Sequence, residues 1–293
     1  MRKIILVYNP VSGNSLFKHK LDEVFEVFSD VGIAVIPYRT RRDGLVGLAD
    51  LVRSTMPEGV LIAGGDGTVS LVMQEILTEK LDVAVGIVPS GTSNDFAKYV
   101  GLDGHLAAYA KAVAEKRTMM IDVGKVNDRY FINVVGAGLA AGVAHSVDAG
   151  LKNSIGKMAY YLRGIGEVPK FRPMEIELEI DGVPYKELVY MFLVLNSGTV
   201  AGFPNVLPAK VNDGVLDIVL VSQCSWAELM TLFVGILSGK DVRLHKCVQY
   251  YQAKTITVRA EEDIESDIDG ELGPMLPLHI EAVPKALRLY TTN

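Results

Sequence analysis

A cluster of small and polar residues, Gly64-Gly65-Asp66-Gly67-Thr68, lies between an apolar run and a helix-like pattern. Gly64 and Gly65 allow a tight turn and leave no Cβ in the way of a ligand. Thr68 and the amides after it lie where a helix would begin, and free N–H groups and the helix dipole attract anions there. Asp66 would repel a phosphate unless a cation or a ribose hydroxyl lies between them, or unless the carboxylate orients a metal-bound water. The alternative is an ordinary turn in which Thr68 caps the helix.

Two further loops carry the same kinds of residue. The segment YNPVSGNS, residues 8–15, follows one apolar run, and VPSGTSNDFAKYVGL, residues 88–102, follows another. Each places Gly, Asn and Ser or Thr at the end of an expected strand. In the second segment, the alternative role for Asn94 or Asp95 is to cap the next helix. If the strands are parallel, the three loops converge on one edge of the sheet, where such sheets bind ligands. The sequence therefore predicts a phosphate site at that edge.

The elements that must position these loops follow from the pattern of residues 1 to about 120. Short β-rich runs occupy residues 3–8, 33–38, 59–63 and 82–88. Between them, apolar residues recur at i, i+3, i+4 and i+7 in segments that begin near Leu21, Leu45 and Val69, as in amphipathic helices. Alternation of this kind predicts a parallel sheet covered by helices.

Beyond residue 120 the strands follow one another with few helices between them. Strands are expected at residues 119–126, 130–135, 174–180, 188–196, 215–221, 254–260 and 278–283. This pattern is typical of an antiparallel β-sandwich or barrel. Helices are expected near 154–166 and 225–238; the second has an apolar face for which core packing is the expected role and membrane contact the alternative. That face consists of Trp226, Leu229, Leu232, Phe233, Ile236 and Leu237.

Composition excludes several classes of protein. The chain has 293 residues, of which 49% are hydrophobic and 22% charged, which is enough for two domains. Mean hydropathy is +0.26, yet the sequence contains no run of about 18 apolar residues, the length needed to span a bilayer. The N-terminus is expected to be a strand and not a signal peptide. A net charge of −6 argues against nucleic-acid binding. Cys224 and Cys247 form no disulfide framework, so a reducing cytosol is expected.

Three motifs together, NPVSG, GGDGT and PSGTSNDFA, resemble the lipid kinases related to diacylglycerol kinase catalytic domains, which include bacterial soluble diacylglycerol kinases and sphingosine kinases. GGDGT alone also occurs in NAD kinases and phosphofructokinases. The resemblance continues through residues 121–138, 196–203, 209–221 and IDGE at 268–271. It implies two domains: an N-terminal parallel-sheet α/β nucleotide-binding domain of the NAD kinase and phosphofructokinase type, and a C-terminal antiparallel β-sandwich. The expected bounds are 1–122, joined by a returning strand at 285–293, and 123–284.

The resemblance also implies a role for each matching residue. The ATP site would be formed by Asn9, Ser12, Gly13, Thr40, Gly64, Gly65, Asp66, Gly67, Thr68, Ser70, Ser90, Gly91, Thr92 and Asn94. Asp66, Asp122 and Asp269 would organise Mg²⁺, partly through water, and Asp66 and Asp122 would be catalytic. Glu271 would be the general base. A structural cation would be bound by the Asp213 carboxylate and the backbone carbonyls of Lys210 and Val215.

The residues alone leave two of these assignments open. The segment ESDIDGELG, residues 265–273, favours a hairpin with Asp269-Gly270 at its tip, and the resemblance favours the catalytic role for Glu271. NDGVLD, residues 212–217, is either an ordinary turn or a cation site. The chain departs from the family where many members continue GGDGT with an apolar residue and then Asn-Glu, because Ser70 and Leu71 stand there.

We therefore expect a cytoplasmic lipid kinase, peripheral to the membrane, that uses ATP and Mg²⁺ to convert diacylglycerol to phosphatidate. Phosphoryl transfer needs positioning, charge neutralisation and an activated hydroxyl, which these residue types supply. The alternatives are a related kinase for a sphingoid base, phosphatidylglycerol or NAD, and a non-catalytic nucleotide- or lipid-binding module. Anionic headgroups could contact a basic series, Lys152, Lys157, Arg163, Lys170 and Arg172, although such a series is usually a solvated face. A homodimer stays open, because the sequence does not define the oligomeric state.

Overall fold

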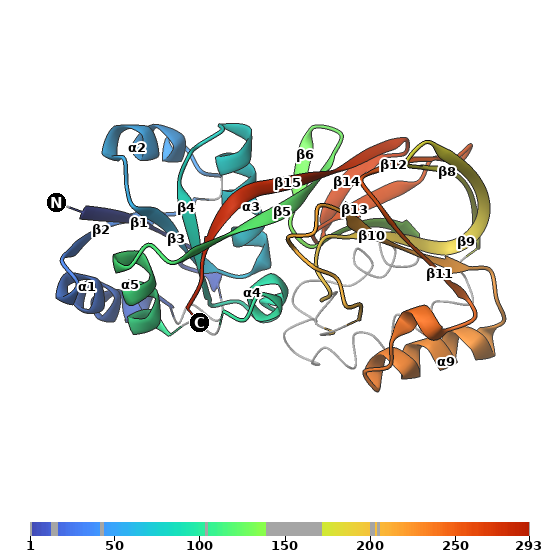
Figure 1. The fold of residues 1–293 in the computed structure, drawn as a ribbon, viewed down its shortest axis with the longest axis horizontal. Coiled ribbons are helices and arrows are strands. Elements are labelled where there is room, and N and C mark those ends of the chain that lie inside the picture. Colours follow the sequence, from blue (N-terminus) through green and yellow to red (C-terminus); the bar gives the residue numbers. More distant parts are fainter. Residues whose placement is uncertain are drawn as a thin grey trace. The chain divides into compact units, whose positions relative to one another are not determined.

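The computed structural model describes residues 2–12, 17–41, 44–102, 105–138, 172–199, 203 and 206–292. The chain divides into two compact units, Met1–Val123 with Pro284–Asn293, and Gly124–Val283. Two strands, β5 (Thr118–Val126) and β15 (Leu278–Tyr290), contribute residues to both units. Figure 1 shows residues 1–123 of the first unit in blue to green and its C-terminal residues in red, with most of the second unit in yellow to red.

The first unit is built on a parallel sheet with the strand order β15-β4-β3-β1-β2. Its strands are β1 (Arg2–Tyr8), β2 (Ile33–Arg39), β3 (Gly59–Gly64) and β4 (Ala84–Pro89). All six residues of β3 are buried, as expected of a strand covered on both faces. The helical segments are η2 (Phe17–Lys20), α1 (Leu21–Asp30), α2 (Leu48–Thr55), α3 (Asp66–Thr78), α4 (Asp95–Tyr99) and α5 (Leu106–Ala114).

The second unit is antiparallel. Its strands are β6 (Arg129–Phe131), β7 (Val134–Gly138), β8 (Met174–Ile180), β9 (Val183–Leu195), β10 (Leu216–Ser222), β11 (Val248–Ala253), β12 (Thr255–Arg259), β13 (Glu265–Ile268) and β14 (Glu271–Met275). β9 is the central strand, because it pairs with β7, β8 and β10. β8 alternates buried and exposed residues along its length, so one of its faces covers the core.

One helix packs on a second, smaller core of this unit. α9 (Trp226–Leu237) begins with a capping box in which the side chains of Ser225 and Glu228 accept each other's backbone N–H groups. The short η4 (Val242–Leu244) follows it. Leu232 is buried in the small core, and Leu229 and Ile236 pack against it.

The structure confirms the predicted fold class, a parallel α/β unit followed by an antiparallel β unit. The helices that follow the Leu21, Leu45 and Val69 patterns are α1, α2 and α3. The helix expected at 154–166 lies outside the described residues. The prediction that the apolar face of α9 packs in the core is only partly right, since Trp226 and Leu237 are exposed. Among the helices that the structure describes, none is long and apolar enough to cross a membrane.

Candidate active site

The carboxyl ends of four parallel strands meet at one edge of the first unit's sheet. Tyr8, the last residue of β1, pairs with Ala63 of β3 and Arg39 of β2, and Gly64 of β3 pairs with Pro89 of β4. Three backbone hydrogen bonds of 3.0 Å join the following loops to neighbouring strands: Asn9 N–H to Ala63 O, Thr40 N–H to Tyr8 O, and Ser90 N–H to Gly64 O. The loops that the sequence placed at one edge are therefore held together there.

These loops surround a cavity of about 400 Å³. It is lined by Asn9, Ser12, Thr40, Arg41, Gly65, Gly67, Thr68, Leu71, Gly91 and Thr92. Arg41 is positively charged, and none of these lining residues is acidic. Hydroxyls, amides and a guanidinium are groups that donate hydrogen bonds to phosphate oxygens. The cavity is therefore suited to an anionic ligand.

The start of α3 contributes backbone amides to this cavity. Gly65 is the N-cap residue and makes no side-chain cap. Thr68 N–H donates to Gly65 O at 2.9 Å, so the first-turn amides that remain for a ligand are those of Asp66 and Gly67. The alternative in which Thr68 caps the helix is wrong, because Thr68 lies inside the first turn. Its buried hydroxyl instead accepts a hydrogen bond from Asn9 Nδ2 at 3.2 Å. This bond fixes the first loop against the helix.

The loop after β4 packs against the α3 start through two glycines. A Cβ on Gly91 would lie 2.4 Å from the Cα of Gly65, closer than real atoms approach. Asn94, in the left-handed conformation at φ 52°, accepts from Gly91 N at 2.8 Å and donates to Gly91 O at 2.9 Å. Ser12 Oγ donates to Ser90 O at 3.4 Å, and the buried Ser90 Oγ has no hydrogen-bond partner among the residues that the structure describes.

Two of the carboxylates predicted to organise Mg²⁺ belong to the first unit, Asp66 at the start of α3 and Asp122 on β5. Asp66 is half-buried at the start of α3, and its Oδ1 accepts from Phe96 N–H at 3.4 Å. Asp122 is 1% exposed on β5, and its Oδ1 accepts from Lys285 N–H at 2.7 Å. Asp66 thus links the GGDGT turn to α4, and Asp122 links β5 to β15.

In the second unit, Asp269 forms the tip of the β13–β14 hairpin, as the residues alone had favoured. Its φ is 53° and its carboxylate accepts three backbone N–H groups, from Ile132, Asn133 and Val134, at 2.9, 2.9 and 3.0 Å. An ionised carboxylate has about four lone-pair sites. Three of them are therefore used to anchor the hairpin to the segment before β7.

Glu271 begins β14, immediately after this tip. Its side chain is 61% exposed, and its Oε2 lies 3.5 Å from Arg129 Nη2. Arg129 also donates from Nη1 to Leu272 O at 3.1 Å. The guanidinium therefore orients the carboxylate while leaving it accessible.

The predicted cation site forms a turn. Asp213 is exposed and its Oδ1 accepts from Val215 N–H at 3.4 Å, with Gly214 at φ 79°. Lys210 precedes this turn and is exposed. This geometry is that of an Asx turn.

The structure brings most of the predicted nucleotide residues together and adds others. Asn9, Ser12, Thr40, Gly65, Gly67, Thr68, Gly91 and Thr92 line the cavity. Gly64, Asp66, Ser90 and Asn94 support it from the same loops, and Ser70 lies in α3. Gly13 lies outside the described residues. Sequence reasoning missed Arg41 and Leu71, although Arg41 directly follows Thr40 at the end of β2.

Family models match both units. The diacylglycerol kinase catalytic domain model matches residues 3–126, and the model described as YegS C-terminal NAD kinase beta sandwich-like domain matches residues 133–291. The chain belongs to the diacylglycerol kinase family.

Individual relatives of this family match over nearly the whole chain. A diacylglycerol kinase of Bacillus subtilis strain 168 is 31% identical over 94% of this chain and 92% of its own. One from Staphylococcus carnosus strain TM300 is 29% identical over 98% and 94%. A crystal structure of a diacylglycerol kinase from Bacillus anthracis strain Sterne has a TM-score of 0.80 at 25% identity and covers 99% of this chain and 96% of that one.

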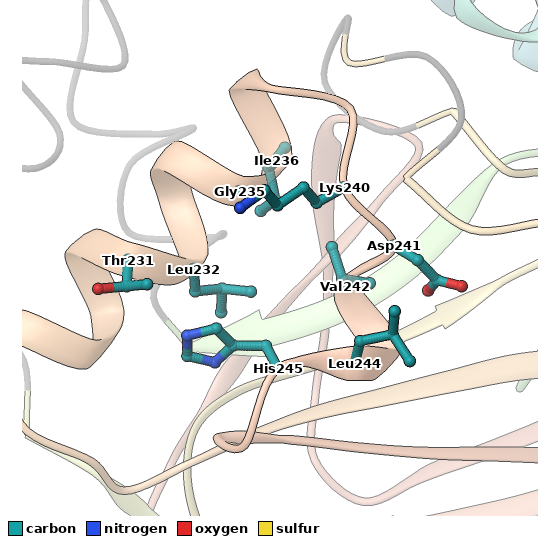
Figure 2. Close-up of a pocket in the computed structure, with 9 residues that line it drawn as sticks. All are labelled: Thr231, Leu232, Gly235, Ile236, Lys240, Asp241, Val242, Leu244 and His245. Atoms are coloured by element: carbon teal, nitrogen blue, oxygen red, sulfur yellow. The ribbon is translucent and has the colours of Figure 1, made fainter.

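This member of the diacylglycerol kinase family has a second cavity, of about 460 Å³, between α9 and η4. Figure 2 shows the side chains of Leu232, Ile236, Val242 and Leu244 around it, with His245 below Leu232. Apolar groups dominate, and Lys240 and Asp241 add charge at its border. This cavity differs in chemistry from the hydroxyl- and amide-rich cavity of the first unit.

Proposed function

We propose that the protein is an ATP-dependent lipid kinase that transfers the γ-phosphoryl group of ATP to the free hydroxyl of diacylglycerol, giving phosphatidate. The observation that carries this proposal is the convergence of the loops after β1, β2, β3 and β4 on a cavity that contains Arg41 and the start of α3. Family membership supports the same reaction, because the matched relatives are named diacylglycerol kinase. Residues 1–122 with 285–293 would bind ATP, and residues 123–284 would bind the lipid.

Within the first unit, the phosphates of ATP would contact the first-turn amides of α3, Thr40 and Thr92. Arg41 would neutralise part of their charge. The buried hydroxyl of Ser90 has no partner in the described part of the chain, and it is one polar atom that a bound nucleotide or its water would satisfy. Gly65 and Gly91 bring the two loops into backbone contact, which positions these donors before ATP arrives.

Mg²⁺ fits the carboxylates of this unit. Asp66 and Asp122 would hold it, partly through water, because Mg²⁺ prefers oxygen ligands and retains several waters. When bound, the ion neutralises the charge of the transferring phosphoryl group. Asp269, also predicted to organise Mg²⁺, has three of its acceptor sites occupied by backbone amides. We therefore assign Asp269 the role of positioning Glu271.

Glu271 would accept the proton of the lipid hydroxyl. Its support is its exposed carboxylate, the rigid hairpin tip beside it and the neighbouring Arg129. A primary alcohol is a weak nucleophile at neutral pH, so an oriented carboxylate accelerates its attack on phosphorus.

Diacylglycerol resides in membranes, so the second unit needs a surface that meets lipid. Support comes from α9, where Trp226 is 43% exposed and Val234 is 55% exposed, and from Leu244 beside it at 85%. Such side chains bury apolar area at a bilayer interface, and a cation such as Lys240 is attracted by anionic headgroups. Lys152, Lys157, Arg163 and Lys170 lie outside the described residues, whereas Arg172 is described and exposed.

Two further assignments stay predictions. The Asp213 turn, with the Lys210 and Val215 carbonyls, would hold a structural cation; its support is the exposed carboxylate at the turn. A homodimer would show as twice the 31.8 kDa chain mass in light scattering.

The proposed reaction is tested by assaying a lipid panel in mixed micelles with γ-labelled ATP and Mg²⁺. Label should appear in phosphatidate when diacylglycerol is present, and should disappear in excess chelator. Asp66→Asn tests the proposed site, because it keeps the size of the side chain and removes the charge that Mg²⁺ requires. Labelling of phosphatidate should be nearly lost in this variant. Labelling of NAD, a sphingoid base or phosphatidylglycerol with no labelling of diacylglycerol would contradict the proposed substrate. Full turnover by Asp66→Asn would contradict the proposed site.

A further inference from the structure

Cys224, Glu228 and Cys247 bring three metal-ligating atoms together in the second unit, and the proposed phosphoryl transfer uses none of them. The two Sγ atoms and a carboxylate oxygen all lie within 4.8 Å of one another. The chain has two cysteines, so both of its thiols meet at this point. Zn²⁺ binds sulfur at about 2.3 Å and carboxylate oxygen at about 2.0–2.2 Å, which puts tetrahedral ligand atoms about 3.5–3.8 Å apart. The cluster is therefore close to the size that such an ion needs.

Several hydrogen bonds hold the three ligands in place. The capping box fixes Glu228, whose Oε2 accepts from Ser225 N–H at 2.7 Å. The carbonyl of Cys247 accepts from Ser222 N–H at 2.9 Å, which joins the start of β11 to the end of β10. The carbonyl of Cys224 accepts from the Tyr190 hydroxyl at 3.4 Å. Because the backbones of the two cysteines and the side chain of Glu228 are held by these bonds, little rearrangement is needed for a cation to bind.

The charges of the cluster would balance around a divalent cation. Lys246 Nζ lies 2.5 Å from Glu228 Oε1. Two thiolates and one carboxylate carry three negative charges, and a divalent cation with the Lys246 ammonium carries three positive ones. Binding of the cation would release the protons of the two thiols, as metal binding to cysteine generally does.

We propose that Cys224, Glu228 and Cys247 bind one thiophilic divalent cation of the Zn²⁺ class, with water in the fourth position. The cation would tie the β10–α9 connection to the turn before β11 and so stabilise the start of α9. Three protein ligands and an open position are a recurrent zinc arrangement. This site is independent of the proposed kinase reaction.

The test is a titration of the full-length, reduced and metal-free protein with Co²⁺ and then Zn²⁺. A thiolate-to-Co²⁺ charge-transfer absorption should saturate at one equivalent and disappear as Zn²⁺ displaces Co²⁺, because sites of this kind prefer Zn²⁺. Cys224→Ser and Cys247→Ser should each abolish the absorption. Glu228→Gln should weaken Co²⁺ affinity by about tenfold or more, while keeping a capping box, since Gln also serves at that position.

Ser225→Ala is the matched control, because it removes the helix cap and leaves all three ligands. It should retain the charge-transfer band, which separates loss of a ligand from loss of local structure. The proposal is overturned if the wild-type protein shows no such band in excess Co²⁺, if the band survives both serine substitutions, or if the metal binds without a sulfur signature. Formation of a Cys224–Cys247 disulfide by a protein that takes up no metal when reduced would overturn it as well.

Discussion

Replacement of Glu271 by Gln gives the most specific prediction at the scale of single residues. Gln keeps the size of the side chain but cannot accept the proton of the lipid hydroxyl, so kcat should fall by about 10²–10⁴-fold. ATP affinity should change little, because the residues proposed to bind ATP belong to the first unit. Steady-state kinetics on diacylglycerol micelles and ATP binding by calorimetry measure the two quantities separately.

Glu265→Gln is the matched control for this variant, since Glu265 is an exposed carboxylate on β13 of the same hairpin. It should leave kcat unchanged. Unaltered turnover in Glu271→Gln would show that another group takes the proton.

Residue types and spacing placed most of the cavity-lining residues at one edge of the sheet, because they lie in or next to loops that follow strands whose ends the sequence marks. Thr68 shows the limit of such reasoning. A Thr at the start of a helical pattern suggests a cap, yet Gly65 is the N-cap residue. The Thr68 hydroxyl instead accepts a hydrogen bond from Asn9, which lies in another loop 59 positions away. Asp269 shows the same limit, since its three amide partners lie about 135 positions earlier in the chain. Local sequence does not encode such partners.

Gly91→Ala tests the packing between elements that forms the cavity proposed to bind the nucleotide. The added Cβ would lie 2.4 Å from Gly65 Cα and 2.9 Å from Asn94 Oδ1, so the loop after β4 must move away from the start of α3. Because main-chain atoms cannot rotate aside as a long side chain can, we expect ATP affinity to fall about tenfold or more, equivalent to about 1.4 kcal/mol or more. Calorimetric titration with an ATP analogue measures it.

Gly235→Ala is the control for this substitution. Gly235 lies inside α9, and a Cβ there would meet, among the described residues, only Lys240 Cβ, at 3.9 Å. Ala favours a helix interior by about 1 kcal/mol over Gly, so the control should fold at least as well as wild type and bind ATP normally. Equal ATP affinity in Gly91→Ala and wild type would show that the glycine contact does not shape the site.

The strands of the first unit were predictable because their buried runs are short and end in turn residues. The helix α5 was not identified, because its segment is rich in Ala, which distinguishes poorly between buried and exposed faces. The apolar pattern of α9 indicated a helix correctly but could not say how much of it packs. Its core neighbours come from β9, β10 and η4, and they leave Val234 and Leu237 exposed.

At the scale of the whole molecule, the first unit is assembled from both ends of the chain. Leu289 on β15 pairs with Val85 on β4, in parallel with the N-terminal strands. The Tyr290 hydroxyl donates to Glu58 O at 2.7 Å, and Lys285 N–H holds the Asp122 carboxylate. Folding of the first unit therefore depends on β15, which is far in the sequence from the other strands of this parallel sheet.

Truncation after Val283 should consequently unfold the first unit, because it removes the residues 284–293 that belong to this unit. It removes Leu287, Leu289 and Tyr290, which are 2%, 0% and 2% exposed. Each fully buried side chain of this size stabilises by about 1.5–3 kcal/mol, so the three together contribute about 5–9 kcal/mol, comparable to the total stability of about 5–15 kcal/mol of a typical domain. The truncated protein should lose the cooperative thermal unfolding transition of the first unit and should no longer bind ATP. Removal of Thr292 and Asn293 alone should leave both intact, because it spares all three buried side chains. A truncated protein that still unfolds cooperatively at the wild-type temperature and binds ATP would show that β15 is dispensable for the first unit.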